Sequence, residues 1–304
     1  MPELPEVETI VRDLNKTVLG RKIEDVWSDF KKIVKKPKHF QEFKKEIKGK
    51  KIQKIWRRGK NIIFALSKNK SLLVHQKLTG HLLLGKWQFN KGKWTSLIKG
   101  PLSEDPRNRF LHLIFWLDNG QQLSLSDLRK FAKVELWDSK DLRKSKEFNA
   151  LGPEPLEKSF TLEKFKECLK NKKGKIKQVL MDQTIIVGIG NIYSDEILWA
   201  AKIHPVRNAS KLNKDELKRI YQAMRKILPK AIELGGESFS DFRRISGEKG
   251  YFDKERKVYR REGEKCSRCQ NAIKRVKLAG RSAHFCPKCQ KAKRTSSSSS
   301  PSLP

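Results

Sequence analysis

The sequence predicts a multidomain α+β protein with an N-terminal antiparallel β-sandwich and its packed helix, a helical domain, and a C-terminal four-cysteine module. Three observations predict this class. Short runs rich in β-branched and aromatic residues fill the first half of the 304 residues. A helical period replaces them after a segment rich in Pro and Gly at 151–155. Two Cys-x2-Cys pairs near the C-terminus have the spacing of a metal site.

The first element is a helix that starts at Pro5 and ends near Gly20, because proline suits a first helical turn. Its apolar face consists of Val7, Ile10, Val11 and Leu14. Strands follow at 23–27, 52–56, 61–66, 71–75, 82–86, 94–98, 110–117, 121–126 and 131–137. Asn119-Gly120 joins two of them as a tight hairpin. Since no helical pattern of comparable length interrupts this region, we expect neighbouring strands to pair in a sandwich against which the helix packs.

The helical domain begins at 151–155, where two prolines and a glycine end the strand pattern. Helices are predicted at 162–169 and 192–201, and a longer one opens at Asn213, which forms a capping box with Glu216. Pro229 should kink or end that helix. The predicted domains are 2–150, 151–240 and 241–293, followed by a disordered low-complexity tail at 294–304.

The charge of the chain indicates a polyanionic partner. Lys and Arg number 69 against 34 Asp and Glu, so the formal net charge is +35. The alternative is a proteome that is rich in lysine throughout. No apolar run reaches membrane-spanning length and no signal pattern opens the chain. We therefore expect a protein of the cytoplasm, where cysteines stay reduced and clustered cysteines indicate metal.

The motif Cys266-x2-Cys269-x16-Cys286-x2-Cys289 predicts one structural zinc ion. This spacing lets four thiolates close a tetrahedral site, and no open ligand position is evident. Metal binding would fold a hairpin that is too small to fold alone. Residues 241–294 carry 18 Lys and Arg against 6 Asp and Glu, so we expect the module to contact nucleic acid. Cys168 is expected to be a buried helix residue.

The N-terminal stretch Met1-Pro2-Glu3-Leu4-Pro5-Glu6 suggests a nucleophile. If Met1 is removed, the terminus is a secondary amine, and an α-amino group titrates at about 7.7–8.0, so part of it is uncharged near neutral pH. Such an amine can attack a sugar carbon, and the positive end of the first helix disfavours its ammonium form. The alternative is an ordinary Met-Pro start whose glutamates complement the helix dipole.

A glycine-bearing run at 185–191 leads into the helix at 192–201. Gly188-x-Gly190 lacks the third glycine of a dinucleotide fingerprint. A helix-turn-helix that holds a nucleic-acid phosphate on backbone amides and on Asn191 fits better. A purely structural turn is the alternative.

Together these segments resemble one family, the bacterial formamidopyrimidine-DNA glycosylases (Fpg/MutM) of the wider Fpg/Nei group. The resemblance extends from Met1 to about Lys293. It is carried by residues 2–9, Arg58-Gly-Lys60, 75–80, 127–131, 187–193, Gly250-Tyr-Phe252, Gly280-Arg281 and 284–289. It implies a helix–two-turn–helix domain and a zinc finger whose hairpin tip contacts DNA. It also implies a bifunctional base-excision-repair enzyme, a glycosylase for formamidopyrimidines and 8-oxoguanine with abasic-site lyase activity.

The resemblance also implies residue roles. Pro2 would be the Schiff-base nucleophile on C1′, Glu3 the acid/base at the opening sugar, and Lys60 a phosphate ligand that assists β-elimination. Asn191 and Arg281 would hold the phosphates that flank the flipped nucleotide, with Arg281 also serving in δ-elimination. The other implied DNA contacts are His75, Lys172, Arg129, Leu78 and Phe131. The last three would fill the gap that the extruded base leaves, whereas the alternative places Leu78 and Phe131 in the sandwich core.

Three departures from the family pattern affect these expectations. Gly247-Glu-Lys-Gly250 replaces Gly-Lys-Pro-Gly, which puts the lesion contacts of that loop in doubt. Leu78 replaces a methionine, and Leu128 replaces a proline. Two rival functions are an endonuclease VIII-like glycosylase for oxidised pyrimidines and a non-catalytic zinc-ribbon protein that binds nucleic acid. We expect a monomer of the bacterial cytoplasm, associated with the nucleoid, whose partner is double-stranded DNA with damaged bases or abasic sites and which has no membrane partner.

Overall fold

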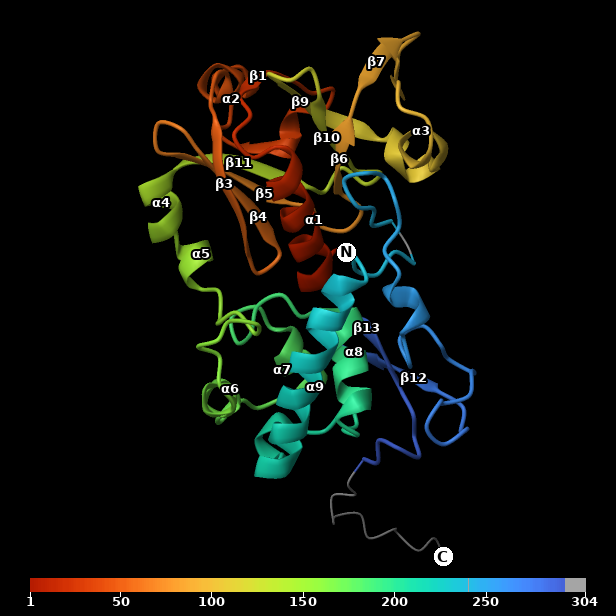
Figure 1. Cartoon of the computed structure of the whole chain (residues 1–304). Helices are drawn as coiled ribbons and strands as arrows, with labels where there is room; N and C mark the ends of the chain where they lie inside the picture. Colours follow the sequence, from red (N-terminus) through yellow and green to blue (C-terminus); the bar gives the residue numbers. More distant parts are fainter. Residues whose placement is uncertain (240, 293–304) are drawn as a thin grey trace, which may run out of the picture.

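The computed structural model describes residues 1–239 and 241–292. A β-rich half contains the first strands, a helical half contains the later helices, and the N-terminus lies between the two (Figure 1). The predicted tail at 294–304 lies outside the described residues. Within the described part of the chain, no helix has the length and apolar character that crossing a membrane requires.

Two sheets form the β-rich half, as the strand pattern predicts. The four-stranded sheet has the order β1 (Ile23–Trp27), β9 (Leu111–Leu117), β10 (Gln122–Ser126) and β6 (His81–Gly85). The five-stranded sheet has the order β2 (Val34–Lys36), β11 (Lys133–Asp138), β5 (Lys70–His75), β4 (Asn61–Leu66) and β3 (Ile52–Arg58). Neighbours pair antiparallel except β2 and β11, which are parallel. A separate hairpin joins β7 (Trp87–Asn90) and β8 (Lys93–Ser96).

The core lies between these sheets and is closed by α1 (Leu4–Thr17). Val7, Ile10 and Leu14 are fully buried on one face of α1, as their helical spacing predicts. A second helix, α2 (Phe40–Ile47), was not expected, and it adds Phe43 and Ile47 to the same core. With 8 residues against the 14 of α1, this helix is too short for its three apolar positions, Phe40, Phe43 and Ile47, to give a clear helical pattern.

The helical half follows a short connection through α4 (Ser139–Lys144) and α5 (Lys146–Asn149). It contains α6 (Leu162–Leu169), α7 (Ile176–Met181), α8 (Asn191–Ala200) and α9 (Lys214–Glu233). The capping box of Asn213 and Glu216 is confirmed, with hydrogen bonds of 2.8 and 2.9 Å. Pro229 does not end α9, because Leu228, Ala231 and Ile232 remain buried on its apolar face. Cys168 on α6 is only partly buried.

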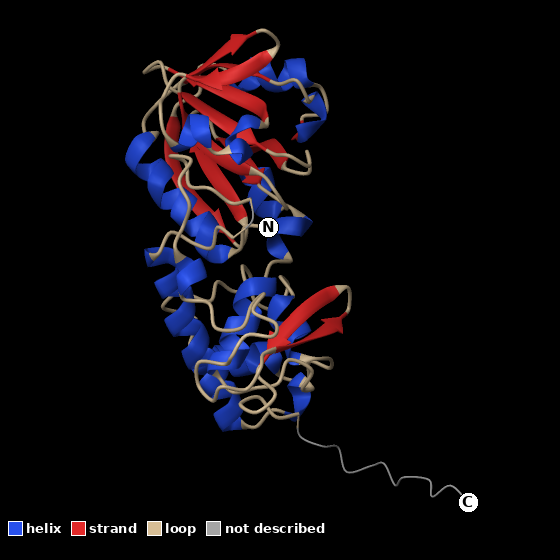
Figure 2. Ribbon diagram, turned by 90° about the vertical axis from the view of Figure 1, so that its right-hand side faces the viewer, coloured by secondary structure: helices blue, strands red, loops and turns tan. Residues whose placement is uncertain are grey.

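In the zinc module, β12 (Lys274–Leu278) and β13 (Arg281–Phe285) form a hairpin between the two cysteine pairs. Its turn consists of Ala279 and Gly280, both with positive φ. β13 packs against α8, and the hairpin rises from the helical half toward the level of the N-terminus (Figure 2). The remaining short helices are α3 (Pro101–Glu104), η1 (Lys31–Ile33), η2 (Pro106–Arg109), η3 (Ala209–Lys211) and η4 (Phe252–Lys254).

Candidate active site

Glu3 connects the N-terminus to the helical half. Its carboxylate accepts the backbone N–H groups of Gly190 at 2.7 Å, Ile192 at 2.8 Å and Tyr193 at 3.3 Å. These amides begin α8, so the carboxylate lies at the positive end of that helix. Pro2 is buried beside Glu3, whereas Met1 is 41% exposed. The amine that removal of Met1 would create therefore starts next to a fixed carboxylate.

The glycines of the 185–191 run allow this close approach. A Cβ on Gly190 would lie 2.5 Å from Cδ of Glu3, and one on Gly188 would lie 2.7 Å from Cβ of Leu4. Leu4 N–H also donates to the carbonyl of Gly188 at 3.0 Å. The expectation that these amides hold a phosphate is wrong for Gly190, Ile192 and Tyr193, since Glu3 already uses them. The side chain of Asn191 has Oδ1 buried without a hydrogen-bond partner in the described part of the chain.

Glu6 is a second buried carboxylate at this centre. It accepts the N–H of Glu3 at 2.7 Å, the hydroxyl of Tyr193 at 2.6 Å and the N–H of Glu237 at 2.8 Å. Burial, and then the charge of Glu3, raise the pKa of Glu6 to about 7 against these hydrogen bonds. Glu6 therefore exchanges a proton near neutral pH, one helical turn from Pro2.

Lys60 lies in the turn between β3 and β4 and is only 7% exposed. The turn is held by Glu154, whose carboxylate accepts the N–H of Gly59 at 2.6 Å and pairs with Arg57. Burial lowers the pKa of Lys60, the charges of Glu3 and Glu6 oppose that shift, and the charge of Arg281 adds to it. Charges from the N-terminal segment and from Arg281 on the zinc hairpin therefore both act on the ammonium of Lys60.

His75 and Lys60 line a cavity of about 310 Å³ together with Lys77 and Lys133. The Nδ1 of His75 accepts the N–H of Lys77 at 3.0 Å. Burial, and then the charges of Lys77, Lys60 and Lys133, lower the pKa of His75 to about 3, so the ring is neutral at physiological pH. Glu135 and Glu147 also line this cavity and pair with Lys133 at 3.0 and 3.7 Å, so its basic groups lie beside two carboxylates.

Two loops at the edge of the sandwich are tied together by Asp127. Its carboxylate accepts the hydroxyl of Thr79, and it accepts the N–H of Ala132 at 2.7 Å. The loop tips remain outside the core, since Phe131 is 50% exposed and Leu78 is partly buried. Arg129 is exposed and lies over the ring of Phe131, 4.8 Å from its centroid. The alternative that places Phe131 in the core is therefore wrong, and β11 begins after it at Lys133.

Arg281 and Lys172 lie on the side of the helical half. Arg281 is exposed at the first position of β13, directly after the hairpin turn. Lys172 is exposed on the loop between α6 and α7. The structure thus brings Glu3, Glu6, Lys60, Asn191 and Arg281 to one centre and leaves Lys172 on a separate loop.

The four predicted zinc ligands form one cluster. The Sγ atoms of Cys266, Cys269, Cys286 and Cys289 all lie within 4.8 Å of one another. Four thiolates at this spacing fit a tetrahedral zinc ion, whose bonds to sulfur are about 2.3 Å long. The Nε2 of Gln290 donates to the carbonyl of Ile203 at 2.9 Å, and its Oε1 accepts the N–H of Cys286 at 2.8 Å. The cluster is therefore the site of one structural zinc ion, anchored to the helical half.

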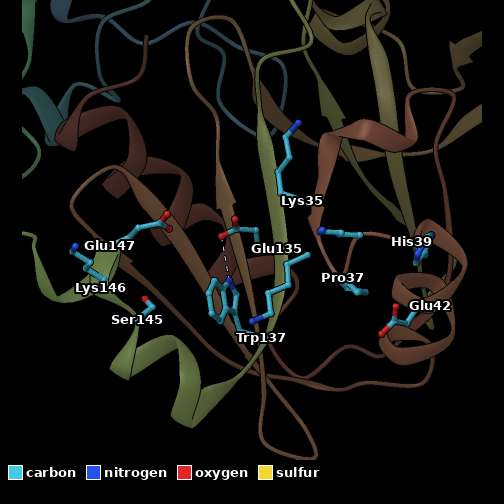
Figure 3. Close-up of a pocket in the computed structure, with 11 residues that line it drawn as sticks. Lys35, Pro37, His39, Glu42, Glu135, Trp137, Ser145, Lys146 and Glu147 are labelled. Carbon is cyan, nitrogen blue, oxygen red and sulfur yellow. Dashed lines mark hydrogen bonds between the residues drawn. The ribbon is translucent and has the colours of Figure 1, made fainter.

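Another cavity, of about 750 Å³, lies beside β2 and β11. Nζ of Lys36 lies 3.4 Å from the centroid of the Trp137 ring, and Glu135 accepts the indole N–H of Trp137 at 3.1 Å (Figure 3). None of the predicted site residues lines it. It adjoins the cavity of Lys60 and His75, since Glu135, Trp137, Ser145 and Glu147 line both.

Family models match three parts of the chain. They describe a formamidopyrimidine-DNA glycosylase N-terminal domain over residues 1–134, a formamidopyrimidine-DNA glycosylase H2TH domain over 151–243, and a zinc finger found in FPG and IleRS over 263–292. A formamidopyrimidine-DNA glycosylase from Pelotomaculum thermopropionicum is 41% identical over 96% of this chain and 100% of its own length. This chain belongs to the formamidopyrimidine-DNA glycosylase family.

Solved structures agree with this family. The Lactococcus lactis Fpg (MutM) in complex with Fapy-dG containing DNA has a TM-score of 0.82 and 37% identity, and covers 95% of this chain and 100% of its own. Its complex with abasic-site DNA gives the same TM-score, identity and coverage. The α+β fold class, the H2TH domain and the zinc finger predicted from the sequence are confirmed.

Glu6 and Tyr193 were not expected as members of the centre, because the sequence pattern indicated only that Glu6 complements the helix dipole. Asp195 and Glu196, which are buried on α8, were not expected there either. Acidic residues inside an otherwise apolar helix were the available signal.

Proposed function

We propose that this chain is a bifunctional DNA glycosylase and abasic-site lyase that removes oxidised purines, formamidopyrimidines and 8-oxoguanine, from double-stranded DNA. The observation that carries the proposal is the carboxylate of Glu3, buried next to Pro2 and held by three amides of α8. A glycosylase of this kind needs an amine and an acid together at one sugar carbon. Family membership and the match to DNA complexes support the substrate class.

Pro2 is the proposed nucleophile once Met1 is removed. Its nitrogen forms a bond to C1′ and gives its proton to Glu3, while the damaged base leaves with the electron pair of the glycosidic bond and takes up a proton from water. The nitrogen lone pair then forms an iminium as the C1′–O4′ bond breaks, and Glu3 passes its proton to O4′. The amides of α8 keep the Glu3 carboxylate in place before and after that transfer.

Strand cleavage then follows in two eliminations. Loss of a proton from C2′ releases the 3′ phosphate, and Lys60 binds phosphate and assists this step. A second elimination releases the 5′ phosphate, with Arg281 as the proposed proton donor, and water hydrolyses the remaining iminium to free Pro2. The lowered pKa of Lys60 favours an amine that can accept a proton.

The DNA contacts are proposed from the same geometry. Asn191 and Arg281 hold the phosphates on either side of the flipped nucleotide, while His75 and Lys172 bind the backbone elsewhere. Leu78 and Phe131 insert into the stack, and Arg129 bonds to the unpaired base. The exposure of Phe131 and Arg129 on tied loops supports this insertion.

The proposed domains are the catalytic sandwich at 2–150, the helix–two-turn–helix domain at 151–240 and the zinc finger with the lesion loop at 241–293. In that loop Glu248 accepts the hydroxyl of Ser246 at 3.0 Å. We expect the protein to work in the bacterial cytoplasm, on the DNA of the nucleoid.

Borohydride trapping tests the proposal directly. The mature protein should form a covalent adduct with a duplex that carries one abasic site. A panel of duplexes with 8-oxoguanine, formamidopyrimidine or an oxidised pyrimidine then gives the preferred base. No adduct would exclude the lyase, and a preference for pyrimidines would assign the endonuclease VIII-like activity instead.

A further inference from the structure

A fully buried ion pair lies behind the proposed active site. Nζ of Lys177 on α7 is 2.6 Å from Oδ1 of Asp195 on α8, and the two side chains are 1% and 0% exposed. A buried pair of this kind often contributes little to stability, because desolvating both charges offsets their attraction. Its presence therefore needs a reason other than stability.

The hydrogen bonds of Lys177 indicate that reason. An ammonium has three N–H donors, and those of Lys177 reach Asp195 Oδ1, the carbonyl of Ser282 at 2.9 Å and the carbonyl of Asn191 at 3.3 Å. Ser282 directly follows Arg281 on β13. One side chain therefore bridges the backbone of Asn191 and the backbone next to Arg281.

Asp195 completes the connection. Its second oxygen, Oδ2, accepts the backbone N–H of His284 at 2.9 Å and lies 3.0 Å from Nδ1 of the same residue. Asp195 is on α8, one turn after Asn191. The hairpin is thus bonded at two points, Ser282 and His284, to the helix whose first amides hold Glu3.

The strands of the hairpin also pack through the rings of Phe285 and His284, whose centroids lie 4.3 Å from that of His204 and 5.3 Å from that of Tyr259. A cavity of about 220 Å³ separates the tip of the hairpin from α7, lined by Lys177, Gln178, Met181, Asp182, Leu278, Ala279 and Arg281. The base of the module is anchored elsewhere, by Gln290 to Ile203 and by the indole of Trp199, which donates to Cys266 Sγ at 3.5 Å. Loss of the ion pair would therefore remove the bonds to Ser282 and His284, shift the strand that carries Arg281, and leave the zinc cluster attached.

We propose that Asp195 and Lys177 are positioning residues that set the distance between Asn191 and Arg281, and so align Arg281 for the second elimination. This proposal rests on the proposed function. Loss of the ion pair should slow the second elimination more than the first, because the first uses Pro2, Glu3 and Lys60 and depends less on the hairpin.

The experiment compares the products of both eliminations on a duplex with one abasic site. The variants are Asp195→Asn and the double variant Lys177→Met with Asp195→Leu, which removes both charges and leaves none unpaired. We expect both variants to keep bound zinc and to show borohydride trapping within about twofold of the wild type. The thermal midpoint should fall more in Asp195→Asn, which leaves the buried ammonium of Lys177 without its carboxylate, than in the double variant. The second elimination should slow by about 10- to 100-fold, the loss that misplacing a reacting group by about 1 Å brings.

Two controls sharpen the comparison. Arg281→Ala measures the loss when the aligned group itself is removed. Arg207→Met breaks another largely buried pair of the helical half, with Glu216 at 2.9 Å, that does not contact the hairpin, and it should leave the product ratio unchanged. If the double variant does not fold, Asp195→Asn, which keeps the shape and one acceptor, carries the test.

The outcomes separate the two proposals. A wild-type protein that neither traps nor cleaves abasic DNA contradicts the proposed function itself. A wild-type protein that cleaves, together with folded, zinc-bound variants whose product ratio equals that of the wild type, overturns the role of Asp195 and Lys177. An equal loss of both eliminations overturns it as well.

Discussion

The carboxylate of Glu3 accepts the backbone N–H of Gly190 at 2.7 Å, across 187 residues of sequence. This contact ties the first helix of the sandwich to the helical half at the point where the chemistry is proposed. Gly190 is needed there because any side chain would overlap Glu3.

Gly190→Ala should therefore displace Glu3. A Cβ would lie 2.5 Å from Cδ of Glu3, so we expect base release to fall by about 100-fold, as for a catalytic group moved by about 1 Å. Single-turnover release of 8-oxoguanine measures this. Gly85→Ala is the control, since its Cβ would meet Leu102 and Trp87 at 3.0 Å in a hydrophobic cluster that contains no residue of the N-terminal segment. Equal losses in both variants would contradict a specific role for the Gly190 contact.

Blocking the N-terminus should abolish covalent trapping. Any residue retained before Pro2 converts its amine to an amide, which is not nucleophilic, while DNA binding should persist. Pro2→Gly keeps a primary amine and should trap more slowly. Borohydride trapping and a binding titration on the same abasic duplex provide the two measurements. Adduct formation by the extended protein would remove Pro2 from the mechanism.

Glu6 should make stability depend on pH. Its pKa is raised to about 7 in the folded protein, so the folded state retains a proton that the unfolded state releases above about 4.5. The contribution of Glu6 to the free energy of unfolding is fully present below pH 4.5 and is lost as pH rises through 7. The loss amounts to about 3 kcal/mol, at about 1.36 kcal/mol per pKa unit. Denaturant unfolding at several pH values should show wild type weakening relative to Glu6→Gln over this range. A constant difference between the two proteins would exclude the shift.

Zinc should be needed for DNA binding more than for the sandwich core. Cys286→Ser should release the one bound ion and weaken binding to lesion DNA, because Arg281 lies on the hairpin between the two cysteine pairs. Arg281→Ala should retain zinc and reduce the salt slope of log K by about 0.9, the effect of one phosphate contact. Metal analysis and titrations at several salt concentrations test both. An unchanged slope with full incision would contradict the phosphate contact.

Leu78 and Phe131 should matter for base extrusion and not for stability. Since Phe131 is 50% exposed, Phe131→Ala should change the free energy of unfolding by less than about 0.5 kcal/mol. Leu82→Ala is the core control, because Leu82 is 1% exposed and should cost about 2–5 kcal/mol. Incision at a paired lesion should fall in Leu78→Ala and Phe131→Ala, while cleavage of a preformed abasic site should suffer less. Arg129→Ala should alter the opposite-base preference, and an unchanged preference would rule out its contact with the unpaired base.

Local pattern was enough to predict much of the fold. The strands at 23–27 and 61–66 match β1 and β4, and the capping box at Asn213 marks the start of α9, because alternation and capping depend on residues a few positions apart. Short elements such as β2 and α2 were not predicted, since three or eight residues show too little periodicity.

The sequence by itself determined the residue types of the site: an amine-forming Pro2, a carboxylate beside it, a lysine in a turn, and four cysteines with zinc spacing. Only the tertiary structure decided how they act together. It placed the amides of α8 on Glu3, enclosed Glu6 so that its pKa rises to about 7, and used Asp195 and Lys177 to join the zinc hairpin to α8. These properties depend on burial and on contacts between segments far apart in the chain, which periodicity and spacing do not report.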